Sequence, residues 1–267
     1  MANPGELANL IWAQHRNRVR FEPIAHLLPG APGAAPAVAD AYAVQEQLVR
    51  LMIPSEGTPA GYKIGLTTAK MQRMCGIDEP VAGRILARRV LRSGAGVAAA
   101  DFVRLGIESE LCLVLSEDLP SGPQPHRLAD VARAIGGAAA AFELIEDRGA
   151  DYARLEACSL IADNSWNAGV VLGNVVSPRG AGLDVGALAG ALMVDGKVVD
   201  SGSSADAMSH PYAVVLWLAN HLRGYRQSLR AGDLVMTGSI ATTRFAKAGE
   251  HYRFTLAGLE PVDLRIT

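Results

Sequence analysis

The segment Ile107–Leu115, Ile-Glu-Ser-Glu-Leu-Cys-Leu-Val-Leu, carries the pattern that decides the fold. Ile, Leu and Val dominate it, and neither Gly nor Pro interrupts it, which is typical of a β-strand. Side chains alternate between the faces of a strand, so Glu108 and Glu110 share one face about 7 Å apart. Two carboxylates on an apolar strand repel each other, and burial adds to the free-energy cost of keeping both of them ionised. A divalent cation between them would remove this conflict, because hard cations such as Mg²⁺ take oxygen ligands.

A Glu-x-Glu pair alone does not establish a site, since such pairs commonly decorate the solvated face of an edge strand. Here Cys112 and Val114 continue the glutamate face with apolar side chains. Glu143 lies in a second apolar run, where an unpaired charge would be costly. Lys63 is enclosed in the apolar segment 62–66. It is either a snorkelling surface lysine or a lysine whose pKa is tuned for proton transfer.

Composition limits the class of protein. The 267 residues suit one large domain or a main domain with a smaller N-terminal cap. A formal net charge of −2 gives no basic footprint for nucleic acid, and no apolar run approaches the ~20 residues of a membrane span. Cys75, Cys112 and Cys158 are few, dispersed and odd in number, which suits a reducing compartment. Without a secretory signal pattern at the N-terminus, we expect a soluble cytoplasmic protein.

The rest of the chain predicts an α+β protein with helices first and short strands after them. We expect a Pro/Gly/Ala linker over 29–37, a helix capped by Asp40 and ended by Pro54 and Gly57, and a loop over 94–100. Further helices are expected over 6–18, 68–74, 128–141 and 212–223, the last one opened by His210 and Pro211. Strands are expected at 61–66, 82–86, 107–115, 142–146, 170–172, 191–194, 197–200, 234–237 and 252–256.

Several motifs in register resemble one enzyme family. Gly61–Thr67 (GYKIGLT) is similar to the GxKIGLT segment of the 2-keto-4-pentenoate hydratase / 2-oxo-3-hexenedioate (4-oxalocrotonate) decarboxylase family, within the fumarylacetoacetate hydrolase-like superfamily. Gly76–Pro80 resembles its GVDxP element, Ile107–Glu110 its IEAE strand and Phe142–Arg148 its ALEIxxSR segment. The segments 162–164, 209–211, 217–219 and 232–238 follow in the family's order. The resemblance extends from about Asp40 to the C-terminus.

The resemblance implies a mixed β-roll core of the fumarylacetoacetate hydrolase C-terminal type, with peripheral helices and assembly as a homo-oligomer. The residue pattern itself predicts that residues 1–57 form a helical N-terminal cap that is not independent, followed by a β-rich catalytic domain over residues 58–267. The resemblance also implies a Mg²⁺ or Mn²⁺ ion held by Glu108, Glu110 and Glu143. The residues implied at the substrate are the acid/base pair Lys63 and Asp78 together with Leu66, Asn164 and Thr237, and we expect Trp166 there as a departure from the family pattern.

The implied activity is that of a hydratase. It adds water to a 2-hydroxy-2,4-dienoate, the enol form of a 2-oxo-4-enoate, and gives a 4-hydroxy-2-oxo acid through a metal-bound enolate, as in meta-cleavage pathways for aromatic hydrocarbons. The same enolate also serves decarboxylation of a 2-oxo-3-enedioate or C–C bond hydrolysis, and both remain alternatives. A non-enzymatic partner subunit is less favoured, because a structural protein gains nothing from so many buried charges. Association with a pathway decarboxylase or aldolase is a further partner that the resemblance suggests.

Two segments depart from the family pattern. The family commonly has small residues where this chain has Ser165-Trp166-Asn167-Ala168, so Trp166 would reshape the pocket if this loop faces it. After Gly238 the chain continues Ser-Ile-Ala-Thr, which is closer to the decarboxylase branch.

The sequence lacks the patterns of several other kinds of site. The histidines lack zinc spacing, and neither a GxSxG elbow nor a GxxxxGK[ST] loop occurs. Arg88, Arg89 and Arg92 are interpreted as a solvated strand end, with binding of a second substrate carboxylate as the alternative.

Overall fold

The computed structural model describes residues 3–28 and 37–267, and two mixed sheets form its core. The larger sheet has the order β2-β1-β10-β5-β6-β7-β3, with β11 paired to β5. Its strands are β1 (Pro59–Gly65), β2 (Val81–Leu86), β3 (Val90–Arg92), β5 (Leu105–Leu115), β6 (Ile135–Glu146), β7 (Asn167–Leu172), β10 (Leu234–Ser239) and β11 (Arg244–Phe245). The second sheet has the order β4-β13-β12-β8-β9. Its strands are β4 (Ala95–Val97), β8 (Ala189–Val194), β9 (Lys197–Ser203), β12 (His251–Leu256) and β13 (Val262–Ile266). The predicted α+β class with a mixed β core is confirmed.

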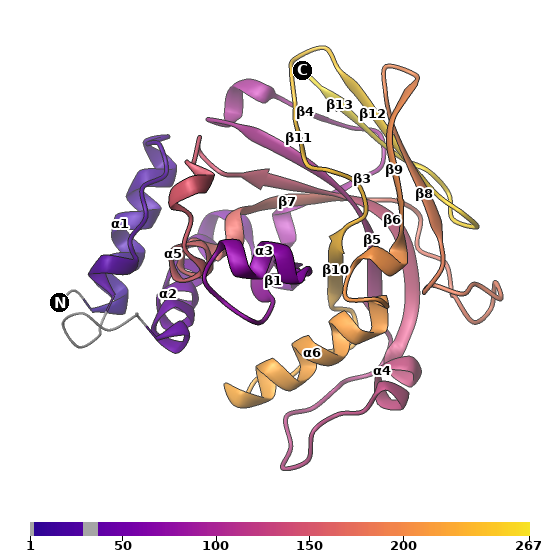
Figure 1. Ribbon diagram of the computed structural model, residues 1–267, viewed down its shortest axis with the longest axis horizontal. Helices are drawn as coiled ribbons and strands as arrows, with labels where there is room; N and C mark the ends of the chain where they lie inside the picture. The colour runs from indigo at the N-terminus through magenta and orange to yellow at the C-terminus, as the bar shows by residue number, and fades with distance from the viewer. Residues whose placement is uncertain (1–2, 29–36) are drawn as a thin grey trace.

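Helices surround this core. They are α1 (Pro4–Arg16), α2 (Val38–Glu56), α3 (Ala69–Met74), α4 (Leu128–Ala134), α5 (Ala157–Ala162) and α6 (Pro211–Gly224). Figure 1 shows α1, α2 and α5 gathered at one end of the molecule, with the second sheet at the other end. None of the helices in the described ranges is long and apolar enough to cross a membrane.

The N-terminal helices share a core with the strands. Leu7 and Ile11 of α1 and Leu48 of α2 belong to a buried cluster that also contains Val81 of β2 and Ile161 of α5. Most of the predicted 29–37 linker lies outside the described residues.

The helix termini correct one prediction and confirm another. Helix α2 is preceded by Ala37 as its N-cap residue, so Asp40 lies inside the first turn and is not the cap. It continues through Pro54 to Glu56 and ends at Gly57, whose φ of 82° suits glycine. Helix α6 begins as predicted, because Nδ1 of His210 accepts a hydrogen bond of 3.0 Å from the Tyr212 backbone N–H.

The prediction of a helix over 128–141 is wrong in its second half. Helix α4 ends at Ala134, and the Gly- and Ala-rich run starting at Ile135 is strand β6, buried over nearly its whole length. Two glycines at its start disfavour a helix. Close packing also requires small residues here, since a Cβ on Gly137 would lie 2.5 Å from Cγ1 of Val175. The interior position of β6 therefore overrides the helix propensity of its alanines.

Some short strands were not predicted. Part of the loop expected over 94–100 is β4, and β13 forms the strand between β4 and β12. Strands β3 and β11 contain only three and two residues, which is too short for a periodic pattern.

Candidate metal centre and substrate cavity

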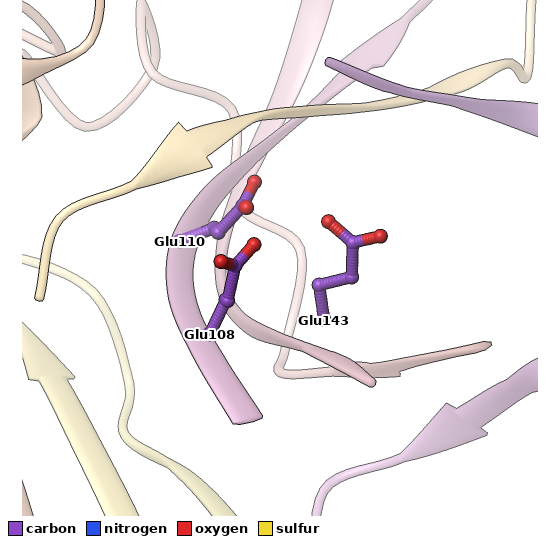
Figure 2. Close-up of side chains that lie close together, drawn as sticks. All are labelled: Glu108, Glu110 and Glu143. Atoms are coloured by element: carbon purple, nitrogen blue, oxygen red, sulfur yellow. The ribbon is translucent and has the colours of Figure 1, made fainter. Parts of the chain in front are cut away.

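Three glutamates meet where β5 and β6 pair at the centre of the larger sheet. Glu108 on β5 lies directly opposite Glu143 on β6, and Glu110 is two residues further along β5 on the same face. One carboxylate oxygen from each lies within 4.8 Å of the others. Figure 2 shows the three carboxylates directed toward a common space. The structure therefore brings together the three residues that the sequence suggested as ligands.

Each carboxylate accepts a hydrogen bond from a residue outside the cluster. The donors are the Thr243 hydroxyl to Glu108 Oε1 at 2.5 Å, the Gly238 N–H to Glu110 Oε2 at 2.8 Å, and the Asn167 amide to Glu143 Oε1 at 2.9 Å. Glu110 Oε1 and Glu143 Oε2 are buried without a hydrogen-bond partner. Two unpartnered carboxylate oxygens in one cluster are costly unless a cation satisfies them. This donor set of hard oxygens suits Mg²⁺ or Mn²⁺.

Lys63 brings a positive charge to the cluster. Its buried Nζ lies 3.3 Å from Oε1 of Glu143. Burial by itself would lower the pKa of Lys63, but the carboxylates, above all Glu143, outweigh burial and raise it. One ammonium therefore faces three carboxylates.

Burial and the excess of negative charge raise the pKa values of two carboxyl groups. Burial, followed by the charges of Glu143 and Glu108, raises the pKa of Glu110 well above its usual value. Burial also raises the pKa of Glu143 to about 7, although Lys63 opposes the shift. A divalent cation would favour the ionised form of both groups.

A cavity of about 300 Å³ opens beside the cluster. Lys63 and Glu108 are the charged residues among its described lining. Its apolar and aromatic lining includes Leu66, Met71, Tyr152, Leu155, Leu160 and Trp166. The other polar side chains are neutral Thr and Ser residues, and Thr243, which orients Glu108, is one of them.

Trp166 reaches the cavity from a strained turn. Asn164, Ser165 and Trp166 are consecutive and have φ values of 50°, 50° and 60°, a region that is costly for non-glycine residues. The Asn164 side chain stabilises the turn by accepting from the Arg84 N–H at 2.7 Å and donating to the Arg84 carbonyl at 2.9 Å. The indole packs edge-on against Phe21, with ring centroids 5.2 Å apart, and against Tyr152 at 5.9 Å.

Of the other predicted site residues, some line the cavity and some do not. Leu66 lines the cavity. Thr237 is buried and donates to the Leu111 carbonyl at 2.9 Å, while the adjacent Gly238 contacts the cluster. Asn164 holds the turn and is not a lining residue. Asp78 is exposed in the segment after α3 and does not line the cavity, so no contact here supports its acid–base role.

Sequence reasoning missed Asn167 and Thr243 as partners of the glutamates. Asn167 lies in the departure from the family pattern, which marked the loop but not this residue's contact with Glu143. Thr243 lies in an irregular segment whose sequence carries no periodic signal.

The sequence pattern of the fumarylacetoacetate (FAA) hydrolase C-terminal family matches residues 78–267, which include all three glutamates. The chain belongs to this family. Similar proteins include the 2-keto-4-pentenoate hydratase of Burkholderia vietnamiensis, which is 30% identical over 268 residues that cover 100% of both chains. The 2-oxo-hept-4-ene-1,7-dioate hydratase of Escherichia coli is 32% identical over 85% of this chain and 86% of that protein.

One solved structure matches nearly the whole chain. The 4-oxalocrotonate decarboxylase from Pseudomonas putida G7, complexed with magnesium and adipate, has a TM-score of 0.89 at 26% identity. The match covers 99% of this chain and 97% of that one. The fold is therefore shared from the N-terminal helices onward, although the matched family pattern begins at residue 78.

Proposed function

We propose that this chain is a metal-dependent hydratase that adds water to a 2-hydroxy-2,4-dienoate to give a 4-hydroxy-2-oxo acid. The observation that carries the proposal is the convergence of Glu108, Glu110 and Glu143 beside a cavity that Lys63 also lines. The hydratase names of relatives at about 30% identity support this reaction over others of the family.

Glu108, Glu110 and Glu143 would hold Mg²⁺ or Mn²⁺. When bound, the cation would supply a Lewis acid for the carboxylate and 2-oxygen of a 2-oxo acid. The buried oxygens of Glu110 and Glu143 that lack partners support this ligand set. Thr243 and Asn167 would keep their glutamates in position, as outer residues do in metal sites.

Lys63 would move the proton in this reaction. Tautomerisation of the dienol to the conjugated 2-oxo-3-enoate moves a proton from the 2-hydroxyl group to C5, so a group in the cavity must donate one proton and accept one. Lys63 is the one described lining residue with an ammonium group, and Glu143 holds it in place. Addition of water to this conjugated double bond then places the hydroxyl group on C4 and a proton on C3. The exposed position of Asp78 leaves Lys63 as the residue assigned to proton transfer.

Decarboxylation of a 2-oxo-3-enedioate is the second candidate. It is favoured by the whole-chain structural match to 4-oxalocrotonate decarboxylase. Both reactions use an enolate of a 2-oxo acid, and they differ in whether water is added or CO₂ is lost.

One experiment separates the two candidates. The Mg²⁺-loaded protein is incubated with 2-hydroxypenta-2,4-dienoate and, separately, with 2-oxo-3-hexenedioate, while dienol absorbance and CO₂ are followed. We expect loss of the dienol, dependent on Mg²⁺, abolished by Glu110→Gln and retained in Glu117→Gln, since Glu117 is on the surface. CO₂ from the second compound without turnover of the first would replace hydratase by decarboxylase. Turnover unaffected by chelation or by Glu108→Ala would remove the metal from the proposal.

A further inference from the structure

The charged side chains that line the cavity both belong to, or contact, the glutamate cluster. These side chains are Lys63 and Glu108, and Lys63 is already engaged with Glu143 at 3.3 Å. The remaining polar side chains of the lining are neutral: they carry hydroxyl groups or, in Trp166, an indole N–H that is buried without a hydrogen-bond partner. Within the described residues, nothing in the cavity wall is left to neutralise a second anionic group on a bound molecule.

The wall away from the strands is apolar and aromatic. Met71 belongs to α3, Leu160 to α5, and Trp166 to the turn that follows α5. Tyr152 contributes its ring, because its hydroxyl already donates to Asp147 at 3.1 Å. These side chains form a surface suited to hydrocarbon.

Three arginines that could offer a cation are already paired with carboxylates. Arg104 donates to Asp147 at 2.7 Å through Nε, and Arg148 lies 2.9 Å from Asp163. Arg89, one of the candidates for binding a second carboxylate, pairs with Glu56 at 3.1 Å. None of these three side chains lines the cavity. A carboxylate at the far end of a substrate would therefore lose its hydration without gaining a cation.

We infer that the site selects 2-oxo acids whose far end is uncharged and apolar, and that it rejects dicarboxylates. Met71, Leu160 and Trp166 would contact this tail. The inference rests on the proposed function for the position of the 2-oxo acid group and adds the class of tail. Uncompensated burial of the second carboxylate is what discriminates, because a polar group buried without a partner costs more than a missing apolar contact.

Calorimetric titration with two unreactive probes of equal chain length tests the inference. The Mg²⁺-loaded full chain is titrated with 2-oxohexanoate and with 2-oxohexanedioate. We expect the monoacid to bind roughly tenfold more tightly or better. Met71→Lys should place an ammonium in the wall and tighten the dicarboxylate about tenfold. Met74→Lys on the same helix is the matched control, because Met74 is exposed and does not line the cavity, and it should change neither affinity.

The outcomes separate this inference from the proposed function. Equal or tighter binding of the dicarboxylate by the unaltered protein would overturn the inference and leave the hydratase proposal intact. Failure of Met71→Lys to improve dicarboxylate binding, in protein with an unchanged circular dichroism spectrum, would remove this wall from the tail site. Binding of neither probe to the Mg²⁺-loaded protein would overturn both.

Discussion

Nζ of Lys63 lies 3.3 Å from Oε1 of Glu143, and both side chains are buried between the strands and the cavity. A buried ion pair of this kind contributes little net stability, yet removing one partner is costly because the other charge stays buried. Lys63 also counters the repulsion among the three glutamates. A substitution of Lys63 should therefore affect both the stability of the sheet centre and the proposed reaction.

We expect Lys63→Met to lower the free energy of unfolding of the metal-free protein by roughly 3 kcal/mol and to abolish dienol turnover. Saturating Mg²⁺ should restore part of the stability, since it neutralises the glutamates, but not the activity. Urea unfolding with and without Mg²⁺ measures the first effect. Lys70→Met, at an exposed position in α3, is the control and should leave both quantities unchanged. Retained turnover in Lys63→Met would contradict the proton-transfer role.

The metal-free protein should become less stable as pH rises from 5 to 8. The pKa of Glu143 is raised to about 7 and that of Glu110 is raised well above normal, so between the unfolded value near 4.3 and the folded values the native state binds more protons. The free energy of unfolding therefore falls with rising pH, by on the order of 3 kcal/mol. Chemical denaturation across this range, in EDTA, measures the slope.

Saturating Mg²⁺ should flatten this pH dependence, because the cation favours the ionised carboxylates throughout. Glu110→Gln should also weaken it, since a neutral amide replaces one of the two titrating groups. A metal-free protein whose stability increases over the same range would rule out this account of the two pKa shifts.

The strand pattern was sufficient to find the cluster but not its internal arrangement. Alternation along residues 107–115 placed Glu108 and Glu110 on one face, and the apolar surroundings of Glu143 marked its charge as unusual. That Glu143 lies directly opposite Glu108 depends on the register between β5 and β6, which a single sequence does not specify. The Ala-rich start of β6 resembles a helix locally, and only its interior position makes it a strand.

The residues that orient the three glutamates could not be predicted from the sequence, because they lie far from their partners along the chain. Asn167 and Thr243 contact their glutamates from 24 and 135 residues away. Such contacts follow from tertiary packing and leave no local spacing signal. Asp78 is exposed, so its role as an acid–base residue, which rests on the motif match, stays a prediction.

Asn167→Ala should weaken Mg²⁺ binding about tenfold, the lower end of the effect of residues that orient metal ligands. The Asn167 amide donates to Glu143 at 2.9 Å and helps to lower its pKa against burial. Without this donor, Glu143 takes up a proton more readily and loses its fixed orientation. Calorimetric Mg²⁺ titration at pH 6.5 and 8.5 should show a larger loss at the lower pH. Asn174→Ala, whose amide contacts the exposed Glu260, is the control, and an equal loss there would contradict the prediction.

Asp163 should be the residue that holds the Trp166 turn to the N-terminal helix. Its Oδ1 lies 2.5 Å from Nε2 of His15 in α1, and its Oδ2 lies 2.9 Å from Nη2 of the buried Arg148. Burial would raise the pKa of Asp163, but His15 and Arg148 outweigh burial and lower it.

Asp163→Asn should therefore leave the Arg148 charge buried without its counter-ion and lower the free energy of unfolding by about 3–5 kcal/mol. Because Asp163 directly precedes the strained residues 164–166, the variant should also weaken binding of 2-oxohexanoate, since Trp166 would no longer be fixed at the cavity wall. Urea unfolding and calorimetric titration measure the two effects. Asp101→Asn removes a surface partner of Arg18 and should cost less than about 1 kcal/mol. Unfolding at the wild-type urea concentration in Asp163→Asn would show that this buried network does not stabilise the turn.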